Sequence, residues 1–305
     1  MKKRIIVLFL VLLMLFTTSV IILADDLNMA SIDGYAKANA IGYGTSFMGF
    51  NREYKRAARG RKVVVAVLDT GVNSSLRVFE NRIVDGYDFV NEDKYPVDDN
   101  GHGTYICGII AESTPPNVVI MPIKIADRYG GALTSDIIYA IDYASRHGAN
   151  VINVSMGGYV DKKDMNYYEK WINEFNTPIV CSAGNEKRNL NKKGINYVPA
   201  EFKRSICVSS INKKKKRDKH ANYGKAIDFV APGEGVKMYY YKGGYRMGYG
   251  TSFSTPYVTA MSAMLIAEGK KDVKKELRKR TIDLGSKGKD KYYGYGYPTF
   301  SKKKK

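Results

Sequence analysis

Residues 62–71 read KVVVAVLDTG, a run of β-branched side chains that ends in an aspartate, a threonine and a glycine. Such a run predicts a buried strand followed by a tight turn. Further strands are predicted for the apolar runs at residues 118–125, 150–154, 177–181, 205–209 and 226–230. Apolar residues at helical spacing predict helices at residues 135–146, 163–175, 252–268 and 273–280. Strands that are apolar on both faces and alternate with helices predict a three-layer α/β fold, with a mostly parallel central sheet and helices on both faces.

The composition is that of a globular protein. Of the 305 residues, 44% are hydrophobic and 26% are charged, which excludes a chain that is disordered throughout. Three cysteines exclude a disulfide scaffold. The single long apolar run lies at the N-terminus, which excludes a protein with several membrane spans. The formal net charge of +19 predicts attraction to anionic partners and says nothing about the fold.

The N-terminal segment, residues 1–24, has two interpretations. Three basic residues precede the apolar run Ile5–Ala24, as in a secretory signal peptide. The small residues Thr17–Ser19 near its end favour cleavage, whereas a length of about 20 residues is also enough for an uncleaved membrane anchor. Both interpretations place the rest of the chain outside the cytoplasm, because the basic end stays inside.

The remaining chain is expected to form one domain. Residues 25–40 are predicted to be a short lead-in arm, since they are too few for a folded propeptide. Residues 41–300 show no internal repeat and no linker, so they are assigned to the α/β domain, and residues 301–305 are a basic tail.

Few residues offer reactive chemistry. Cys107, Cys181 and Cys207 each lie in an apolar run and are expected to be small buried hydrophobes. His147 and His220 are expected at the surface, and three scattered histidines offer no paired metal ligands, which disfavours a metal hydrolase.

Three short motifs stand out from this background. His102 lies between glycines in DDNGHGT (residues 98–104), and an apolar, helix-like stretch follows it. Ser252 lies in GTSFSTP (residues 250–256), immediately before a long apolar helix, where a serine can be a plain helix N-cap or a hydroxyl in a field that favours negative charge. Asp69 follows a buried strand, where it can close a turn or orient a histidine and stabilise its charged form.

The order of these motifs is informative. Aspartate, histidine and serine follow one another as they do in subtilisin, and DTGV, DDNGHGT and GTSFSTP resemble the three active-site motifs of the subtilisin-like serine peptidases. Residues 153–158 (NVSMGG), 182–186 (SAGNE), 231–233 (APG) and 293–296 (YGYG) are similar to other landmarks of the same family, so the resemblance covers residues 40 to 300.

The resemblance implies a role for each matching residue. Asp69, His102 and Ser252 would form the catalytic triad, and Asn185 would donate a hydrogen bond to the oxyanion together with the backbone N–H of Ser252. The segment Ser155–Gly157 would pair with an extended substrate as an added strand, and Gly184 would also belong to the substrate-binding site. Met156 could present an apolar wall to the specificity pocket, and Glu186 at its rim could tolerate a basic side chain.

The sequence also departs from the family pattern. Tyr105 stands where many members have a second histidine, and Phe253 and Ser254 replace a common Met-Ala. Residues 112–117 are short where many relatives carry a calcium-binding loop, so no tight calcium site is expected there. No cofactor is expected to be required, and weak calcium sites elsewhere stay open.

Three basic clusters account for much of the charge: residues 213–219, 270–280 and 302–305. They are either solvated loops that aid solubility or a means of adhesion to anionic membrane or cell-wall polymers. Nucleic acid is not expected as a partner, because no recognised binding module accompanies the charge.

These observations together predict an exported serine endopeptidase that is either secreted or held by an N-terminal anchor. Its expected partners are extended peptides or unfolded proteins. Two alternatives stay open, namely a membrane-tethered peptidase that matures one dedicated exported peptide, and a catalytically idle relative that acts as a binding protein.

Overall fold

The computed structural model describes residues 42–190, 192, 194 and 196–301. The predicted signal or anchor, the lead-in arm up to residue 40 and the last four lysines lie outside these residues. Seven strands form one parallel sheet in the order β11-β9-β6-β4-β1-β3-β2. They are β1 Val63–Asp69, β2 Tyr87–Asp88, β3 Val118–Lys124, β4 Val151–Val154, β6 Ile179–Ser182, β9 Ile206–Ile211 and β11 Ile227–Pro232. The predicted parallel sheet is therefore confirmed, and six of its strands lie on the six predicted runs.

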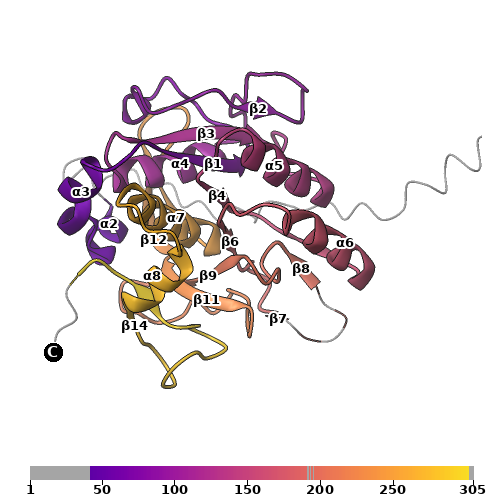
Figure 1. The fold of residues 1–305 in the computed structure, drawn as a ribbon, viewed down its shortest axis with the longest axis vertical. Helices are drawn as coiled ribbons and strands as arrows, with labels where there is room; N and C mark the ends of the chain where they lie inside the picture. Colours follow the sequence, from indigo (N-terminus) through magenta and orange to yellow (C-terminus); the bar gives the residue numbers. More distant parts are fainter. Residues whose placement is uncertain (1–41, 191, 193, 195, 302–305) are drawn as a thin grey trace, which may run out of the picture.

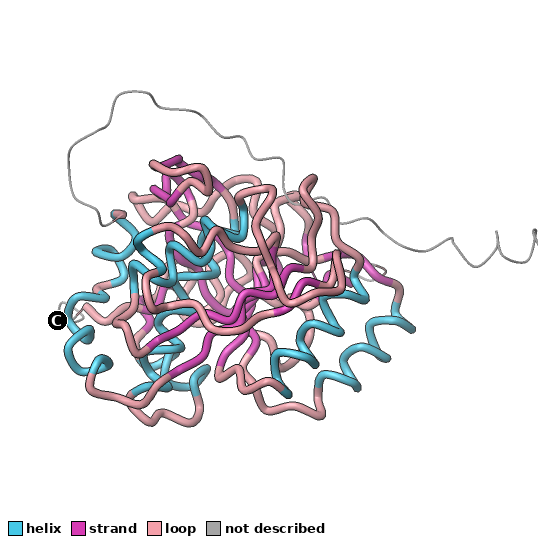
Figure 2. The backbone as a smooth tube through the Cα atoms, turned by 90° about the horizontal axis from the view of Figure 1, so that it is seen from above, coloured by secondary structure: helices cyan, strands magenta, loops and turns pink. Residues whose placement is uncertain are grey.

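Helices cover both faces of this sheet, as predicted (Figure 2). One face carries α4 His102–Ser113 and α7 Thr251–Ala267, with α2 Tyr43–Met48, α3 Phe50–Ala58, the 3-10 turn Arg77–Phe79 and α8 Val273–Lys279 around them. The other face carries α5 Thr134–Arg146 and α6 Lys162–Ile172 (Figure 1). The side chains of β1 alternate between these layers, with Val65 and Val67 in the first core and Ala66 and Leu68 in the second.

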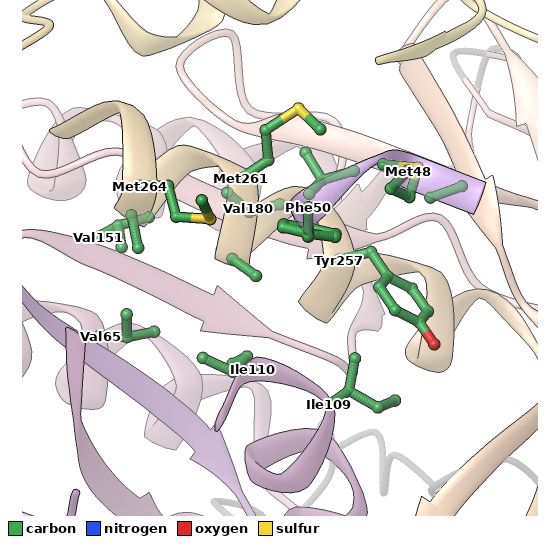
Figure 3. Close-up of a cluster of buried hydrophobic side chains, with 14 of the residues drawn as sticks. Met48, Phe50, Val65, Ile109, Ile110, Val151, Val180, Tyr257, Met261 and Met264 are labelled. Carbon is green, nitrogen blue, oxygen red and sulfur yellow. The ribbon is translucent and has the colours of Figure 1, made fainter. Parts of the chain in front are cut away.

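The helix α7 is buried over its whole length, because it lies against the sheet with α3, α4 and α8 beside it. Figure 3 shows Met261 and Met264 of this helix packed near Val151 and Val180 of the sheet, with Ile110 of α4 below them. Burial of each such side chain contributes about 1.5 to 3 kcal/mol. The start of α7 is thereby held at one fixed position against the sheet.

Four short ladders lie outside the main sheet: β5 Gly158–Val160 with β8 Asn196–Val198, β7 Asn189–Leu190 with β10 Tyr223–Gly224, β12 Glu234–Tyr239 with β13 Tyr245–Tyr249, and β14 Thr281–Ile282 with β15 Tyr297–Pro298. The sequence analysis predicted neither these ladders nor the helices α2 and α3. In the described part of the chain, no helix combines the length and the apolar character that a membrane crossing requires. The apolar run at residues 5–24 lies outside that part.

Candidate active site

The site forms where the carboxyl ends of three neighbouring parallel strands meet. The strands β1, β4 and β6 are adjacent in the sheet. The order in which strands are added reverses at β1, because β3 lies on one side of β1 and β4 on the other. Crevices of α/β sheets bind ligands at such a switch point. Asp69 is the last residue of β1, Ser155 follows β4, and Asn185 lies three residues beyond the end of β6.

A buried hydrogen bond links Asp69 to His102. The Oδ1 atom of Asp69 lies 2.7 Å from Nδ1 of His102 and also accepts a hydrogen bond from the backbone N–H of Thr70 at 2.8 Å. Both side chains are buried, with Asp69 0% and His102 3% exposed. A carboxylate only accepts hydrogen bonds, so Nδ1 carries the hydrogen and Nε2 is the basic nitrogen of the neutral ring. A negative charge at this distance also favours a positive charge on the ring.

The loop before His102 is held by Asp98. Its Oδ1 accepts hydrogen bonds from the Thr70 hydroxyl at 2.8 Å and from the backbone N–H groups of Asn100 at 3.1 Å and Gly101 at 2.7 Å. Its Oδ2 accepts from the backbone N–H and the hydroxyl of Thr104, at 2.8 and 2.5 Å. This buried carboxylate therefore ties the end of β1 to the first turn of α4, which begins at His102.

The backbone of α4 approaches the end of β1 very closely. A Cβ atom placed on Gly103 would lie 2.1 Å from the carbonyl oxygen of Gly71, which is much closer than any non-bonded contact allows. The glycine after His102 is thus needed for close approach.

Ser252 is the second residue of α7, whose N-cap is Gly250, so the interpretation of Ser252 as an N-cap is wrong. Its hydroxyl donates to the carbonyl oxygen of Ser155 at 2.8 Å, and the Ser155 hydroxyl donates to the carbonyl oxygen of Ser252 at 3.0 Å. The aromatic ring of Phe253, the next residue, lies 5.6 Å from the His102 ring, measured between centroids. Ser252, the His102 ring and Ser155, which follows β4, therefore lie close together.

Further hydrogen bonds fix the end of β4 against α7. The amide nitrogen of Asn153 donates to the Ser155 hydroxyl at 2.9 Å, and its amide oxygen accepts from the Thr259 hydroxyl at 2.8 Å. All three side chains are buried, so these bonds form in a low-dielectric interior and hold one arrangement.

Asn185 lies against the start of the same helix. Its Oδ1 accepts a hydrogen bond from the backbone N–H of Thr251 at 3.0 Å, and the Thr251 hydroxyl accepts from the N–H of Gly184 at 3.1 Å. A Cβ atom placed on Gly250 would lie 3.1 Å from Nδ2 of Asn185 and 3.5 Å from its Oδ1, so the whole amide lies close to this glycine. A side-chain donor thus lies beside the segment that carries Ser252.

The structure brings all eight predicted site residues to this edge of the sheet, from five separate segments. Ser155, Met156 and Gly157 form the buried segment after β4, and Gly184 belongs to the segment after β6. Met156 is 4% exposed and packs in the core beneath α5 and α6.

The other reactive residues lie as predicted. The three cysteines are buried and free, and burial raises the pKa of each thiol, that of Cys181 to about 12. His147 and His220 are exposed. Among the residues that the structure describes, no group of three histidine, cysteine or acidic side chains could hold a metal ion.

Lys124, which was not predicted from the sequence, stabilises the segments next to Asp69 and His102. This lysine ends β3, is 1% exposed, and donates from Nζ to the carbonyl oxygens of Thr70 and Ala126 at 2.9 and 3.0 Å and to Oδ1 of Asp99 at 2.6 Å. A lysine inside the apolar run VVIMPIKI was a usable signal, because a buried ammonium requires partners. Asp98, in the same motif as His102, carried no separate signal.

Comparisons with known proteins agree with this geometry. Residues 60–296 match the model of the subtilase family. The chain is 30% identical to the minor extracellular protease Epr of Bacillus subtilis over 255 residues, which are 80% of this chain and 38% of that protein. It is 30% identical to thermitase of Thermoactinomyces vulgaris, over 70% of this chain and 78% of that protein.

The solved structures point the same way. A crystal structure of a lanthipeptide protease superimposes with a TM-score of 0.76 at 27% identity, covering 84% of this chain and 91% of that one. The family match spans more than three quarters of the chain and includes every residue of the site described above. The chain therefore belongs to the subtilase family.

Proposed function

We propose that the protein is a serine endopeptidase that uses Asp69, His102 and Ser252. The Ser252 hydroxyl would donate its proton to Nε2 of His102 while Oγ forms a bond to the carbonyl carbon of the substrate. The protonated His102 would then deliver that proton to the leaving amine as the C–N bond breaks, which leaves an acyl group on Ser252. Water would attack this ester with His102 again as the base, releasing the carboxylic acid and restoring the serine.

Asn185 would stabilise the negative charge that develops on the carbonyl oxygen. Its Oδ1 accepts a hydrogen bond from the N–H of Thr251, which fixes the side chain at the start of α7, and Nδ2 would be the atom that donates to the oxyanion. The segment Ser155–Gly157 would pair with the backbone of an extended substrate, which would favour peptides and unfolded proteins as substrates.

The observation that carries this proposal is the 2.7 Å hydrogen bond between Asp69 and His102, with Ser252 in the first turn of the adjacent buried helix α7. The chain separates these three groups by 33 and 150 residues, and the fold brings them together at the switch point of the sheet. The family membership of the chain supports the same reaction.

Export is part of the proposal. The basic and apolar N-terminus is the sequence support for it. The similarity to an extracellular protease of Bacillus subtilis is further support. The basic clusters would then meet anionic membrane or cell-wall polymers at the site of release.

The second candidate function is the cleavage of a single peptide substrate. The structural similarity to a lanthipeptide protease favours the idea that the enzyme matures one dedicated exported peptide. Such an enzyme would carry the same catalytic residues and differ only in what its binding cleft accepts.

The test uses the purified full-length protein, Ser252→Ala, and the matched control Ser254→Ala. Ser254 lies in the same turn of α7, is equally buried, and donates to the carbonyl oxygen of Ala231 at 3.0 Å. Each protein is treated with a fluorophosphonate probe, which labels activated serines, and is then mixed with unfolded casein.

The wild-type protein and Ser254→Ala are expected to be labelled by the probe and to cleave casein. Ser252→Ala is expected to show neither labelling nor cleavage. Labelling without casein cleavage would favour the dedicated maturation peptidase. A folded wild-type protein that is not labelled would contradict the proposal and favour the idle relative.

A further inference from the structure

The space beside Ser252 is bounded by two chain segments. The strands β4 and β6 are parallel neighbours, so the segments that follow them, Ser155–Gly157 and Ala183–Asn185, leave the sheet side by side. Both are hydrogen-bonded to the start of α7. If the proposed function holds, the side chain that precedes the scissile bond must enter between these two segments.

The ring of Tyr197 already lies between them. A Cβ atom placed on Gly157 would lie 2.7 Å from Cε1 and 2.8 Å from Cζ of Tyr197, and one placed on Gly184 would lie 3.0 Å from Cζ of the same ring. One aromatic ring therefore touches the backbone of both walls. Tyr197 is only 5% exposed, so the ring fills this space and does not cover it as a loose flap.

The backbone holds the ring in this place. Tyr197 lies in β8, directly opposite Tyr159 of the antiparallel strand β5, and their ring centroids are 4.8 Å apart. Glu201 accepts a hydrogen bond from the N–H of Tyr197 and donates its own N–H to the carbonyl oxygen of Tyr197, both at 2.9 Å. Arg188 lies over the outer face of the Tyr159 ring at 4.6 Å. Displacing the ring would disrupt this stack.

The carboxylate at the rim is also engaged. Oε2 of Glu186 accepts hydrogen bonds from Nδ2 of Asn222 at 2.5 Å and from the hydroxyl of Tyr159 at 3.1 Å. A basic substrate side chain would have to compete with both donors. This argues against the use of Glu186 to recognise lysine or arginine.

We infer that Tyr197 closes the specificity pocket, so that the enzyme acts on peptides with glycine, alanine or serine immediately before the scissile bond. A leucine or phenylalanine side chain would need the volume that the buried Tyr197 ring occupies. Cores pack at near-crystalline density and do not absorb such an addition without displacement. This inference rests on the proposed function and names the substrate class of the same site.

The test measures covalent reaction and needs no turnover. Three peptidyl diphenyl phosphonates, identical except for a methyl, isobutyl or benzyl side chain at the position before the reactive phosphorus, compete with the fluorophosphonate probe for the full-length protein. Wild type, Tyr197→Ala, Tyr197→Phe and the control Tyr167→Ala are compared. Tyr167 is 60% exposed on α6, and its ring contacts those of Tyr168 and Trp171.

In wild type, the methyl compound is expected to react at least roughly 100-fold faster than the benzyl compound, because a pocket discriminates about 10- to 200-fold per methylene group and a benzyl group is larger. Tyr197→Phe and Tyr167→Ala should keep this ratio. Tyr197→Ala should lower the ratio at least tenfold by speeding the benzyl compound. Should Tyr197→Ala fail to fold, the wild-type and Tyr197→Phe ratios alone decide the question.

A wild-type protein that the probe labels and that reacts equally fast with the benzyl and methyl compounds would overturn the inference alone. A folded wild-type protein that the probe does not label would overturn the proposed function and, with it, this inference. The two failures are therefore distinguished by the probe itself.

Discussion

Replacing Asp98 by asparagine should destabilise the protein and slow its chemistry, although the shape of the side chain is kept. Asp98 accepts five hydrogen bonds, three through Oδ1 and two through Oδ2. An asparagine oxygen can keep the first three as neutral bonds. Its NH₂ group would face the backbone N–H of Thr104, which is itself a donor, and that buried N–H would lose its acceptor.

The expected cost follows from these contacts. A buried donor left without an acceptor costs about 1 to 3 kcal/mol, and bonds to a charged acceptor are worth about twice those to a neutral one. Loss of a negative charge near the N-terminus of α4 adds about 0.3 to 1 kcal/mol. We expect a total of about 3 kcal/mol, which for a domain of this size lowers the melting temperature by about 6 to 12 °C.

The assay combines thermal unfolding with the rate of fluorophosphonate labelling. Labelling should slow by roughly tenfold, because the Asp98 carboxylate positions the loop that carries His102 and a misplaced base is inefficient. The control is Asp93→Asn, since Asp93 accepts one side-chain bond, from the N–H of Tyr95 at 2.7 Å, which an asparagine oxygen can replace. The reasoning would be refuted by an Asp98→Asn protein that melts and labels like this control.

Three further outcomes follow from the structure. Asn185→Ala should lower kcat by roughly 100- to 1000-fold, the range established for loss of this type of oxyanion donor in subtilisin; unchanged steady-state kinetics would exclude it from the oxyanion site. Lys124→Met should lower the free energy of unfolding by about 3 kcal/mol, because two buried carbonyl oxygens lose their donor, and an unchanged urea midpoint would contradict this. Burial raises the pKa of Glu112, which accepts from the N–H of Gly42 at 2.6 Å, from 4.5 to about 7. The folded state therefore binds this proton more tightly than the unfolded state, and stability should fall as the pH rises from 4.5 to about 7. The full shift corresponds to about 3 kcal/mol, which partial exposure reduces to about 1 to 2; Glu112→Gln should flatten this pH dependence, and a variant with the wild-type slope would show that another group is responsible.

The central sheet was predictable because its strands are marked by local composition. Six apolar, β-branched runs became six parallel strands, since burial on both faces requires continuous hydrophobicity. The two-residue strand β2 and the β12–β13 hairpin contain no continuous apolar, β-branched run, so they were not predicted. The helix α2 is short and contains a glycine, and the helix α3 has few apolar residues to mark a period. Contact with α7 stabilises both helices, and the backbone of Gly44, for example, lies against the ring of Tyr257.

The chemical residues were predictable for a different reason. Each of the proposed catalytic residues Asp69, His102, Ser252 and Asn185 lies within two positions of a glycine, so a short local pattern surrounds each one. Their spatial proximity did not follow from any single pattern, but from the rule that parallel strands end at one edge of a sheet.

The layered α/β fold, the family and the residues that meet at the switch point could all be predicted from the amino-acid sequence, because hydrophobic period and short motifs are local properties of the chain. The contacts that support these residues, and the side chain that lies between the segments beside Ser252, became visible in the three-dimensional structure alone. The bonds of Asp98 and Lys124, and the ring of Tyr197 between Gly157 and Gly184, depend on contacts between segments that lie up to 54 residues apart. Such contacts arise from the packing of strands and helices against one another, and no local pattern in a single sequence records them.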